Sequence, residues 1–409
     1  MDRIVPQDTE SRPRSGHAPW HGDPPPSSPL TRDLTVDVAV VGAGVTGSLV
    51  AEALTRDRRS VAVVDRAVPG RVSTAASTAM LMWEIDTPLV ELADRIGFER
   101  ASAVYRRSLA AVSDLATTTR LLGVDCDLTP RASLQLAGEA GDLPHLAEER
   151  RLRARAGLPG ELLDEETLRR RFRMARPGAL LSPRDAECDP LALVGGMLGI
   201  AARRGARTID DEVLGFERRG DMVEVALAGG RTIRARDVVL ATGYAMPDLL
   251  PAEGHRLVST WCFATAPRRG DDLWPERVLL WETGTPYLYA RTTADGRIVC
   301  GGEDRPTRDE ADREAATADR VARLTARFAD LWPSADLRPS HVWSAEFGET
   351  ADGLPLIGLV PGRPGLWAAY GYGGNGITFS HMAARILAAR LRGERRPWFD
   401  EFAIDRDLG

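Results

Sequence analysis

The feature that most constrains the fold is a glycine pattern between two short apolar runs. The run "VDVAVV" (residues 36–41) leads into "GAGVTG", the segment "SLVAEALTR" follows, and "SVAVVD" (residues 60–65) is the second apolar run. Runs rich in β-branched residues are typical of buried parallel strands. This order therefore predicts a strand–turn–helix–strand unit, the element from which parallel sheets are built.

The spacing of the glycines in this turn is that of a dinucleotide-binding loop. Gly42, Gly44 and Gly47 follow the pattern G-x-G-x-x-G, in which the glycines allow a tight turn, contact with a pyrophosphate and close helix packing. The helix N-terminus offers free N–H groups to phosphates. Asp65 ends the second run, where an acid accepts hydrogen bonds from ribose hydroxyls. The unit predicts dinucleotide binding; a glycine turn that serves packing alone is the alternative.

A second glycine cluster lies far downstream, in "LWAAYGYGGNGITFSH" (residues 366–381). Glycine weakens a helix interior by about 0.5–1 kcal/mol relative to alanine, so we expect a ligand to approach this backbone closely. A third segment, "VVLATGY" (residues 238–244), ends a buried strand in a small-residue turn. Three backbone approaches indicate FAD rather than a nicotinamide nucleotide, which does not need the third.

Length and composition exclude several other classes. The 409 residues are enough for more than one structural domain, and a net charge of −6 gives no general attraction to nucleic acid or anionic lipid. We expect no membrane span, no metal site and a cytoplasmic protein. The four cysteines form no C-x-x-C pair. The chain contains no lysine, which excludes pyridoxal phosphate enzymes, lysine-type aldolases and Walker-A hydrolases.

These segments together resemble a known family. The motifs "VAVVGAGVTG…VAVVD", "STAAST", "VVLATGY", "YARTTADGRIVCGGED" and "DGLPLIG…GYGGNGITFS" occur here in the order typical of the D-amino acid oxidase-like family of FAD-dependent amine and amino acid oxidoreductases. The resemblance covers most of residues 35–395, and "STAASTAMLMWEIDTPL" looks closest to the γ-glutamylputrescine oxidoreductase and glycine oxidase-type branch.

The resemblance implies an α/β fold: a Rossmann-like FAD-binding domain with a parallel central sheet, and a smaller α+β substrate domain built on an antiparallel sheet. Trp20 is the residue expected to pin the N-terminal arm. The predicted bounds are a disordered or loosely packed arm at 1–33, the FAD-binding domain at 34–115, 180–250 and 350–395, the substrate-binding domain at 116–179 and 251–349, and a tail at 396–409.

The resemblance also implies a set of cofactor contacts. The last glycine cluster is expected to lie over the pyrimidine end of the flavin, where a helix N-terminus stabilises negative charge. The FAD is expected to be non-covalent, because "HVWSAEFGETADGLP" lacks the cysteine of the sarcosine oxidase branch. The predicted contacts are Gly42, Gly44, Val45, Thr46, Gly47, Asp65, Arg66, Ser77, Thr78, Val213, Ala241, Thr242, Gly243, Gly373, Gly374, Asn375, Gly376, Ile377 and Thr378.

The reaction implied is oxidation of a C–N bond, with hydride passing to flavin N5 and the resulting imine hydrolysing in water. Arg291 is predicted to hold a substrate carboxylate, and Tyr287 and Tyr289, which alternate with it, to share its face of a strand. An ordinary exposed strand arginine is the alternative. Trp261, Trp281 and Trp343 could be pocket walls or core residues. His381 could lie near the flavin or be packed elsewhere.

Two questions stay open at the level of sequence. The sarcosine oxidase branch uses a lysine for the reaction with oxygen, and this chain has none, so oxygen and another electron acceptor are both open. The alternative function is a flavoprotein subunit of a hetero-oligomeric dehydrogenase that acts with a partner; the chain could form homo- or hetero-oligomers. No nucleic-acid partner is expected.

Overall fold

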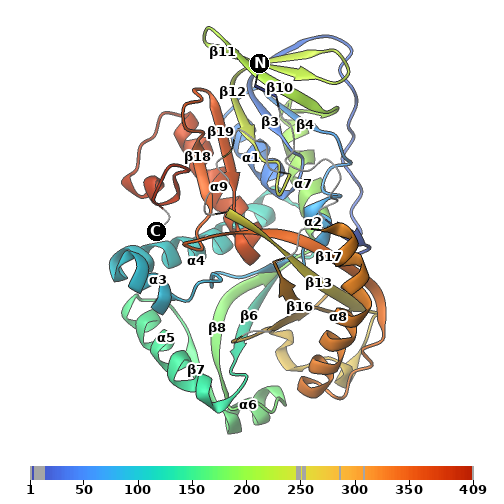
Figure 1. Ribbon diagram of the computed structural model, residues 1–409, viewed down its shortest axis with the longest axis vertical. Coiled ribbons are helices and arrows are strands. Elements are labelled where there is room, and N and C mark those ends of the chain that lie inside the picture. The colour runs from blue at the N-terminus through green and yellow to red at the C-terminus, as the bar shows by residue number, and fades with distance from the viewer. Residues whose placement is uncertain are drawn as a thin grey trace.

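The computed structural model describes residues 2–3, 14–245, 250, 255–284, 287–306 and 309–407. Figure 1 shows two large sheets, one in the upper and one in the lower half of the molecule, with helices packed against them. The predicted combination of a parallel and a largely antiparallel sheet is confirmed. The second sheet has ten described strands and the first has nine, so by strand count it is not the smaller of the two.

The first sheet has a parallel centre made of β9, β4, β3, β12 and β19, and the hairpin β10–β11 extends it. Alternate residues of β3 face its two sides: Val38 and Val40 pack with the helices, whereas Ala39 and Val41 pack with β10–β12. Its strands are β1 (Asp2–Arg3), β10 (Val213–Arg219), β11 (Met222–Leu227), β12 (Thr232–Leu240), β3 (Leu34–Val41), β4 (Val61–Asp65), β9 (Arg207–Asp210), β18 (Leu356–Leu359) and β19 (Leu366–Tyr370).

The second sheet is antiparallel except for the pair β6 and β14. Its long central strands β13 and β17 cross the middle of the molecule, and α8 covers it (Figure 1). Its strands are β2 (Arg14–Gly16), β17 (Pro339–Thr350), β13 (His255–Thr265), β16 (Ile298–Arg305), β15 (Leu288–Thr292), β14 (Leu279–Glu282), β6 (Thr129–Leu136), β8 (Gly178–Glu187), β5 (Met80–Leu81) and β7 (Glu161–Asp164).

Three of the helices, α6, α7 and α8, begin after an aspartate whose side chain caps the helix. Asp189 caps α7 by accepting from the N–H groups of Leu191 and Ala192, with Pro190 at the first position. The helices are α1 (Val45–Arg56), α2 (Ser73–Ala76), α3 (Leu89–Ile96), α4 (Phe98–Leu122), α5 (Leu143–Arg155), α6 (Glu165–Phe172), α7 (Pro190–Arg203), α8 (Glu310–Leu331) and α9 (Gly376–Leu391), with short 3-10 turns η1 (Ala140–Asp142), η2 (Gly270–Asp272), η3 (Pro275–Arg277), η4 (Gly373–Asn375) and η5 (Pro397–Phe402). No helix within these described ranges is both long and apolar enough to cross a membrane.

The predicted domain limit at residue 180 and the predicted loose arm do not agree with the sheets. The limit at residue 180 falls inside β8, which pairs with β5, β6 and β7 in the second sheet. Within the predicted loose arm, β2 pairs with β17, and Trp20 is 7% exposed and donates to the Ser77 carbonyl at 2.8 Å. Residues 14–20 therefore pack more tightly than the polar composition suggested; most of the preceding residues lie outside the described range.

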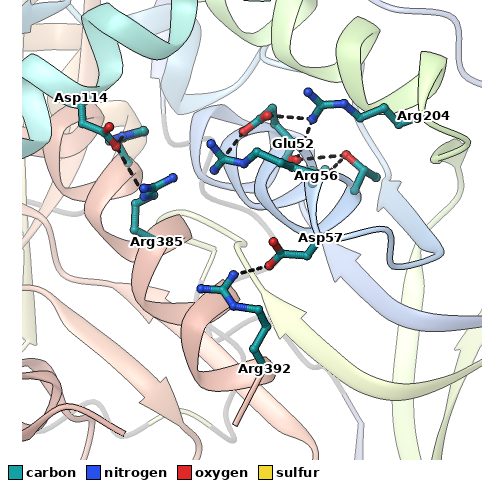
Figure 2. Close-up of polar contacts among 10 residues, drawn as sticks. Glu52, Arg56, Asp57, Asp114, Arg204, Arg385 and Arg392 are labelled. Carbon is teal, nitrogen blue, oxygen red and sulfur yellow. Dashed lines mark hydrogen bonds and ion pairs between the residues drawn. The ribbon is translucent and has the colours of Figure 1, made fainter. Parts of the chain in front are cut away.

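Charged side chains fix the ends of α1 and α9 that are remote from the glycine turns. Glu52 of α1 lies 2.8 Å from Arg204 and 3.6 Å from Arg56, and Asp57 pairs with Arg392 (Figure 2). Glu52 is 3% exposed. Dissolved salt screens an ion pair that has a buried partner less than it screens a pair on the surface. Glu52 thus ties α1 to the end of α7, and the pair between Asp57 and Arg392 joins α1 to the end of α9.

We predict that Gly47→Ala lowers the free energy of unfolding by about 1–3 kcal/mol, the usual range for overpacking. A β-carbon at Gly47 would lie 1.8 Å from the Gly42 carbonyl oxygen, which is backbone and cannot turn away. Urea denaturation measures the change. Gly199→Ala is the matched control: its β-carbon would meet only Arg203, at 3.7 Å, so this variant should be as stable as the parent or more so. Equal stabilities for Gly47→Ala and the parent would contradict the packing argument.

Candidate active site

A cavity of about 770 Å³ lies at the carboxyl edge of the parallel strands. The segments that follow β3, β4, β12 and β19 all contribute to its wall, which is where ligands bind in open parallel sheets. The cavity continues to the second sheet, so it is lined by residues from both halves of the molecule. Its volume is within the usual range of about 300–1,000 Å³ for small-molecule sites.

The first glycine turn forms one end of this cavity. Gly42 and Gly44 line it, whereas Gly47 does not and serves helix packing. Gly42 has a φ of +105°, and a β-carbon there would lie 2.2 Å from the Ala241 carbonyl oxygen. A residue with a side chain would therefore push β12 away from β3.

Two side chains stabilise this turn from within the protein. Asp65 accepts from the N–H of Ala43 at 2.6 Å and from that of Ala67 at 2.9 Å, and burial raises the pKa of its carboxyl. The N–H of Val45, the first residue of α1, donates to Thr74 Oγ1 at 3.0 Å. Thr74 was not among the predicted contacts, although the segment "STAAST" that contains it was expected to run beside the ligand.

The second glycine cluster makes room for an acidic side chain. Gly373 has a φ of +57°, and β-carbons at Gly373 and Gly374 would lie 2.3 and 2.9 Å from the Asp86 carboxylate oxygens. The N–H of Gly374 donates to Asp86 Oδ2 at 2.6 Å. One of the N–H groups expected to face a flavin is therefore bonded to a carboxylate in this structure.

The two glycine clusters meet through α1 and α9. Thr46 Oγ1 lies 3.2 Å from Tyr372 Oη and 2.8 Å from Ser380 Oγ, and all three side chains are buried. The next residues of the cluster hold the chain after β5: Asn375 Nδ2 donates to the Glu84 carbonyl at 2.7 Å, and Thr378 Oγ1 donates to the Met82 carbonyl at 3.0 Å.

Most of the predicted cofactor contacts line this one cavity. Arg66 is at the Asp65 end, where it pairs with Glu212 at 2.9 Å. Two predicted contacts, Gly47 and Thr378, are not in the lining. The predicted residues that do line it are Gly42, Gly44, Val45, Thr46, Asp65, Arg66, Ser77, Thr78, Val213, Ala241, Thr242, Gly243, Gly373, Gly374, Asn375, Gly376 and Ile377.

The structure does not place Arg291 in the cavity, where it was predicted to hold a substrate carboxylate. Arg291 is 2% exposed and does not line the cavity. Its guanidinium donates to the carbonyls of Thr78 at 2.5 Å and Cys188 at 2.7 Å. It also lies 3.5 Å from Glu187 and 4.8 Å from the centre of the Trp20 ring. Arg291 therefore holds the wall segment Ser77–Thr78 from behind and has no free donor pair for a ligand.

The two tyrosines do line the far end of the cavity, as the alternation predicted. The Tyr287 hydroxyl donates to Asp304, and the Tyr289 hydroxyl lies 3.1 Å from Thr260 Oγ1. Trp281 joins them in the wall and pairs with Tyr289 in the sheet. Of the other aromatic candidates, Trp261 and Trp343 are core residues.

His381 is packed away from the cavity. It is 3% exposed and its Nε2 lies 2.8 Å from Asp114 of α4.

Two carboxyl groups at this end have altered acidity. Burial raises the pKa of Asp304 to about 6, and nearby Glu349 adds to the effect. The side chain of Asp86 is exposed to the cavity. Desolvation by the protein around it raises the pKa of its carboxyl to about 6, and the negative charges of Glu349 and Asp304 add to this effect. Perturbed acids in a cavity mark functional sites more often than chance. Both residues were missed because isolated aspartates carry no sequence signal.

A family model described as FAD dependent oxidoreductase (DAO) matches residues 37–390. The chain belongs to this family. It is similar to gamma-glutamylputrescine oxidoreductase of Escherichia coli K12, with 25% identity over 92% of this chain and 88% of that protein. It is similar to glycine oxidase of Geobacillus kaustophilus, with 27% identity over 91% and 97%.

Solved structures show the same fold. The glycine oxidase structure from Geobacillus kaustophilus superposes with a TM-score of 0.77 at 24% identity, covering 92% of this chain and all of that one. The L-proline dehydrogenase structure from P. horikoshii has a TM-score of 0.75 at 18% identity, covering 92% and 98%. As a member of the DAO family, whose model is described as FAD dependent oxidoreductase, this chain is an oxidoreductase whose cofactor is FAD.

The residues of this DAO chain fit that cofactor. The cavity joins a glycine turn at a helix N-terminus, which suits a pyrophosphate, to a second glycine turn at another helix N-terminus, which suits an anionic ring. At Gly44, the only described atom within 4 Å of an added β-carbon is Thr74 Oγ1, at 3.2 Å. The space in front of Gly44 thus belongs to the cavity.

For this reason we predict that Gly44→Val folds but binds FAD at least about tenfold more weakly, a loss of about 1.4 kcal/mol or more. The valine side chain would occupy cavity space instead of displacing backbone. Fluorescence titration of the apoprotein with FAD gives the affinity, and circular dichroism confirms the fold. A Gly44→Val protein that retains FAD as tightly as the parent would exclude this turn from the cofactor site.

Arg291→Met should lower the free energy of unfolding by about 1–3 kcal/mol, because it removes the donors to the carbonyl groups of Thr78 and Cys188. Buried Glu187 keeps its ion pair with Arg131 at 2.7 Å. Thermal and urea denaturation of the FAD-loaded protein give the value. The Michaelis constant should not rise selectively for substrates with a carboxylate. A variant of normal stability with such a selective rise would restore Arg291 as a clamp.

Proposed function

We propose that this oxidoreductase oxidises the C–N bond of an amine or amino acid to an imine, which water then hydrolyses. The proposal is supported by the family and by the relatives' names, which include gamma-glutamylputrescine oxidoreductase, glycine oxidase and D-amino acid dehydrogenase. The observation that carries it is the single cavity: it continues from the nucleotide-type turn at Gly42 to the aromatic wall at Tyr287 and Tyr289.

Each part of the wall has a proposed task. Gly42, Gly44 and the N-terminus of α1 would hold the pyrophosphate, and the N-terminus of α9 would lie at the ring. Bound FAD supplies the acceptor for the hydride that leaves the substrate carbon. Tyr289 and Trp281 would exclude water and orient the amine. FAD is proposed to be non-covalent, since no cysteine is among the described lining residues.

The test is an anaerobic panel of amines and amino acids mixed with the purified yellow protein. We predict that at least one small amine bleaches the visible flavin absorbance, and that an imine-derived aldehyde or keto acid appears in equal amount. If no compound bleaches a flavin that light can still reduce, the proposal fails and a partner-dependent flavoprotein subunit becomes the better explanation.

The same cuvettes identify the electron acceptor. After substrate reduction, air or a quinone analogue is admitted, and the return of flavin absorbance is timed. Rapid return in air identifies an oxidase, and return only with the quinone identifies a dehydrogenase. The chain has no lysine, so a rapid reaction with oxygen would need another cationic group near the ring.

A further inference from the structure

The aromatic end of the cavity is also its acidic end. We define the acidic chamber as the lining residues Asp86, Thr260, Trp281, Tyr287, Tyr289 and Asp304. Tyr287 and Tyr289 lie side by side, with ring centres 6.1 Å apart. Asp304 accepts from the Tyr287 hydroxyl, and Asp86 accepts from Gly374 of the second glycine cluster. The chamber therefore adjoins the place proposed for the flavin ring.

Most carboxylates of the cavity wall already have partners. Glu212 pairs with Arg66 at 2.9 Å, Glu346 with Arg313 at 2.6 Å, and buried Glu84 lies 3.7 Å from Arg153. Just outside the lining, Glu349 pairs with Arg256 at 2.8 Å. Asp65 is held by backbone N–H groups.

Asp86 and Asp304 are different, because neither has an arginine or histidine within ion-pair distance among the residues that the structure describes. Asp304 Oδ1 is buried and has no hydrogen-bond partner. A buried carboxylate without its full set of donors is unfavourable. An ammonium group from a ligand would supply both the donor and the charge.

The chamber also lacks what an amino acid carboxylate would need. The described lining contains one arginine, Arg66, which lies at the opposite, Asp65 end, and Arg291 is committed to backbone carbonyls outside the cavity. Trp281 Nε1 is a buried donor without a partner. One neutral donor does not offset two carboxylates, so a carboxylate here would meet net repulsion.

We therefore propose that the chamber binds an amine with a second positive charge, such as an aliphatic diamine, in preference to an amino acid held by its carboxylate. This inference rests on the proposed amine oxidation. One nitrogen would react in its neutral form, while the far ammonium is held by Asp304 and Asp86. Tyr289 and Trp281 would pack on the methylene chain between them.

A matched series of probes tests the proposal: putrescine, n-butylamine and γ-aminobutyrate. They share a 3-aminopropyl unit and differ in the group at its far end, which is a CH2NH3+ group, a methyl group or a carboxylate. With the FAD-loaded protein under anaerobic conditions, we predict that putrescine reduces the flavin with at least tenfold higher efficiency than n-butylamine, and that γ-aminobutyrate is the poorest. Equal efficiencies, or a preference for γ-aminobutyrate, would overturn the proposal.

Asp304→Asn keeps the acceptor for Tyr287 but removes the charge. It should reduce the advantage of putrescine over n-butylamine about tenfold or more. Glu349→Gln is the matched control: it removes a nearby charge that is outside the lining and already paired. Because Glu349 helps to raise the pKa of Asp304, its loss keeps Asp304 charged and should not reduce the advantage. An unchanged advantage in Asp304→Asn, or an equal loss in both variants, would contradict the proposed contact.

Binding is measured independently of turnover, by the change that each probe makes in the flavin spectrum. Putrescine binding that depends on Asp304, without any bleaching, would support the chamber and reject the oxidation. Equal bleaching by all three probes would support the oxidation and reject the chamber. No spectral change with putrescine at millimolar concentration would reject the chamber on its own.

Discussion

Three buried hydroxyl groups, those of Thr46, Tyr372 and Ser380, join the beginning of α1 to the beginning of α9. The helices lie on one face of the parallel sheet, so this contact directs both N-termini to the same edge (Figure 1). At their other ends the ion pair between Asp57 and Arg392 joins them again (Figure 2). Two glycine turns that are remote in sequence thereby become the two ends of one cavity.

Much of this arrangement could be predicted because glycine and proline restrict the backbone directly. Gly42 marks a turn that no side chain fits, and Pro190 with Asp189 marks a helix start, irrespective of what packs around them. Strand alternation likewise placed Tyr287 and Tyr289 in the wall. Such signals are local, and the parallel sheet follows from them with few alternatives.

The errors concern residues whose role depends on distant segments. The alternation of the strand indicated which face Arg291 is on, but not where along the strand the cavity ends. The carbonyl groups that Arg291 binds belong to Thr78 and Cys188, which are far from it in the sequence. Asp86 bonds to Gly374 from the other end of the sequence. The net charge of −6 gave no hint that two carboxylates gather at one end of a cavity while arginines neutralise the others.

Trp20 and Arg291 lie together behind the part of the cavity wall formed by Ser77 and Thr78. Trp20 bonds to Ser77, Arg291 bonds to Thr78, and the guanidinium stacks on the indole ring. This pair supports the cofactor wall from outside, although neither side chain faces the cavity. A substitution at Trp20 therefore changes how long the coenzyme stays bound while every residue in contact with it remains the same.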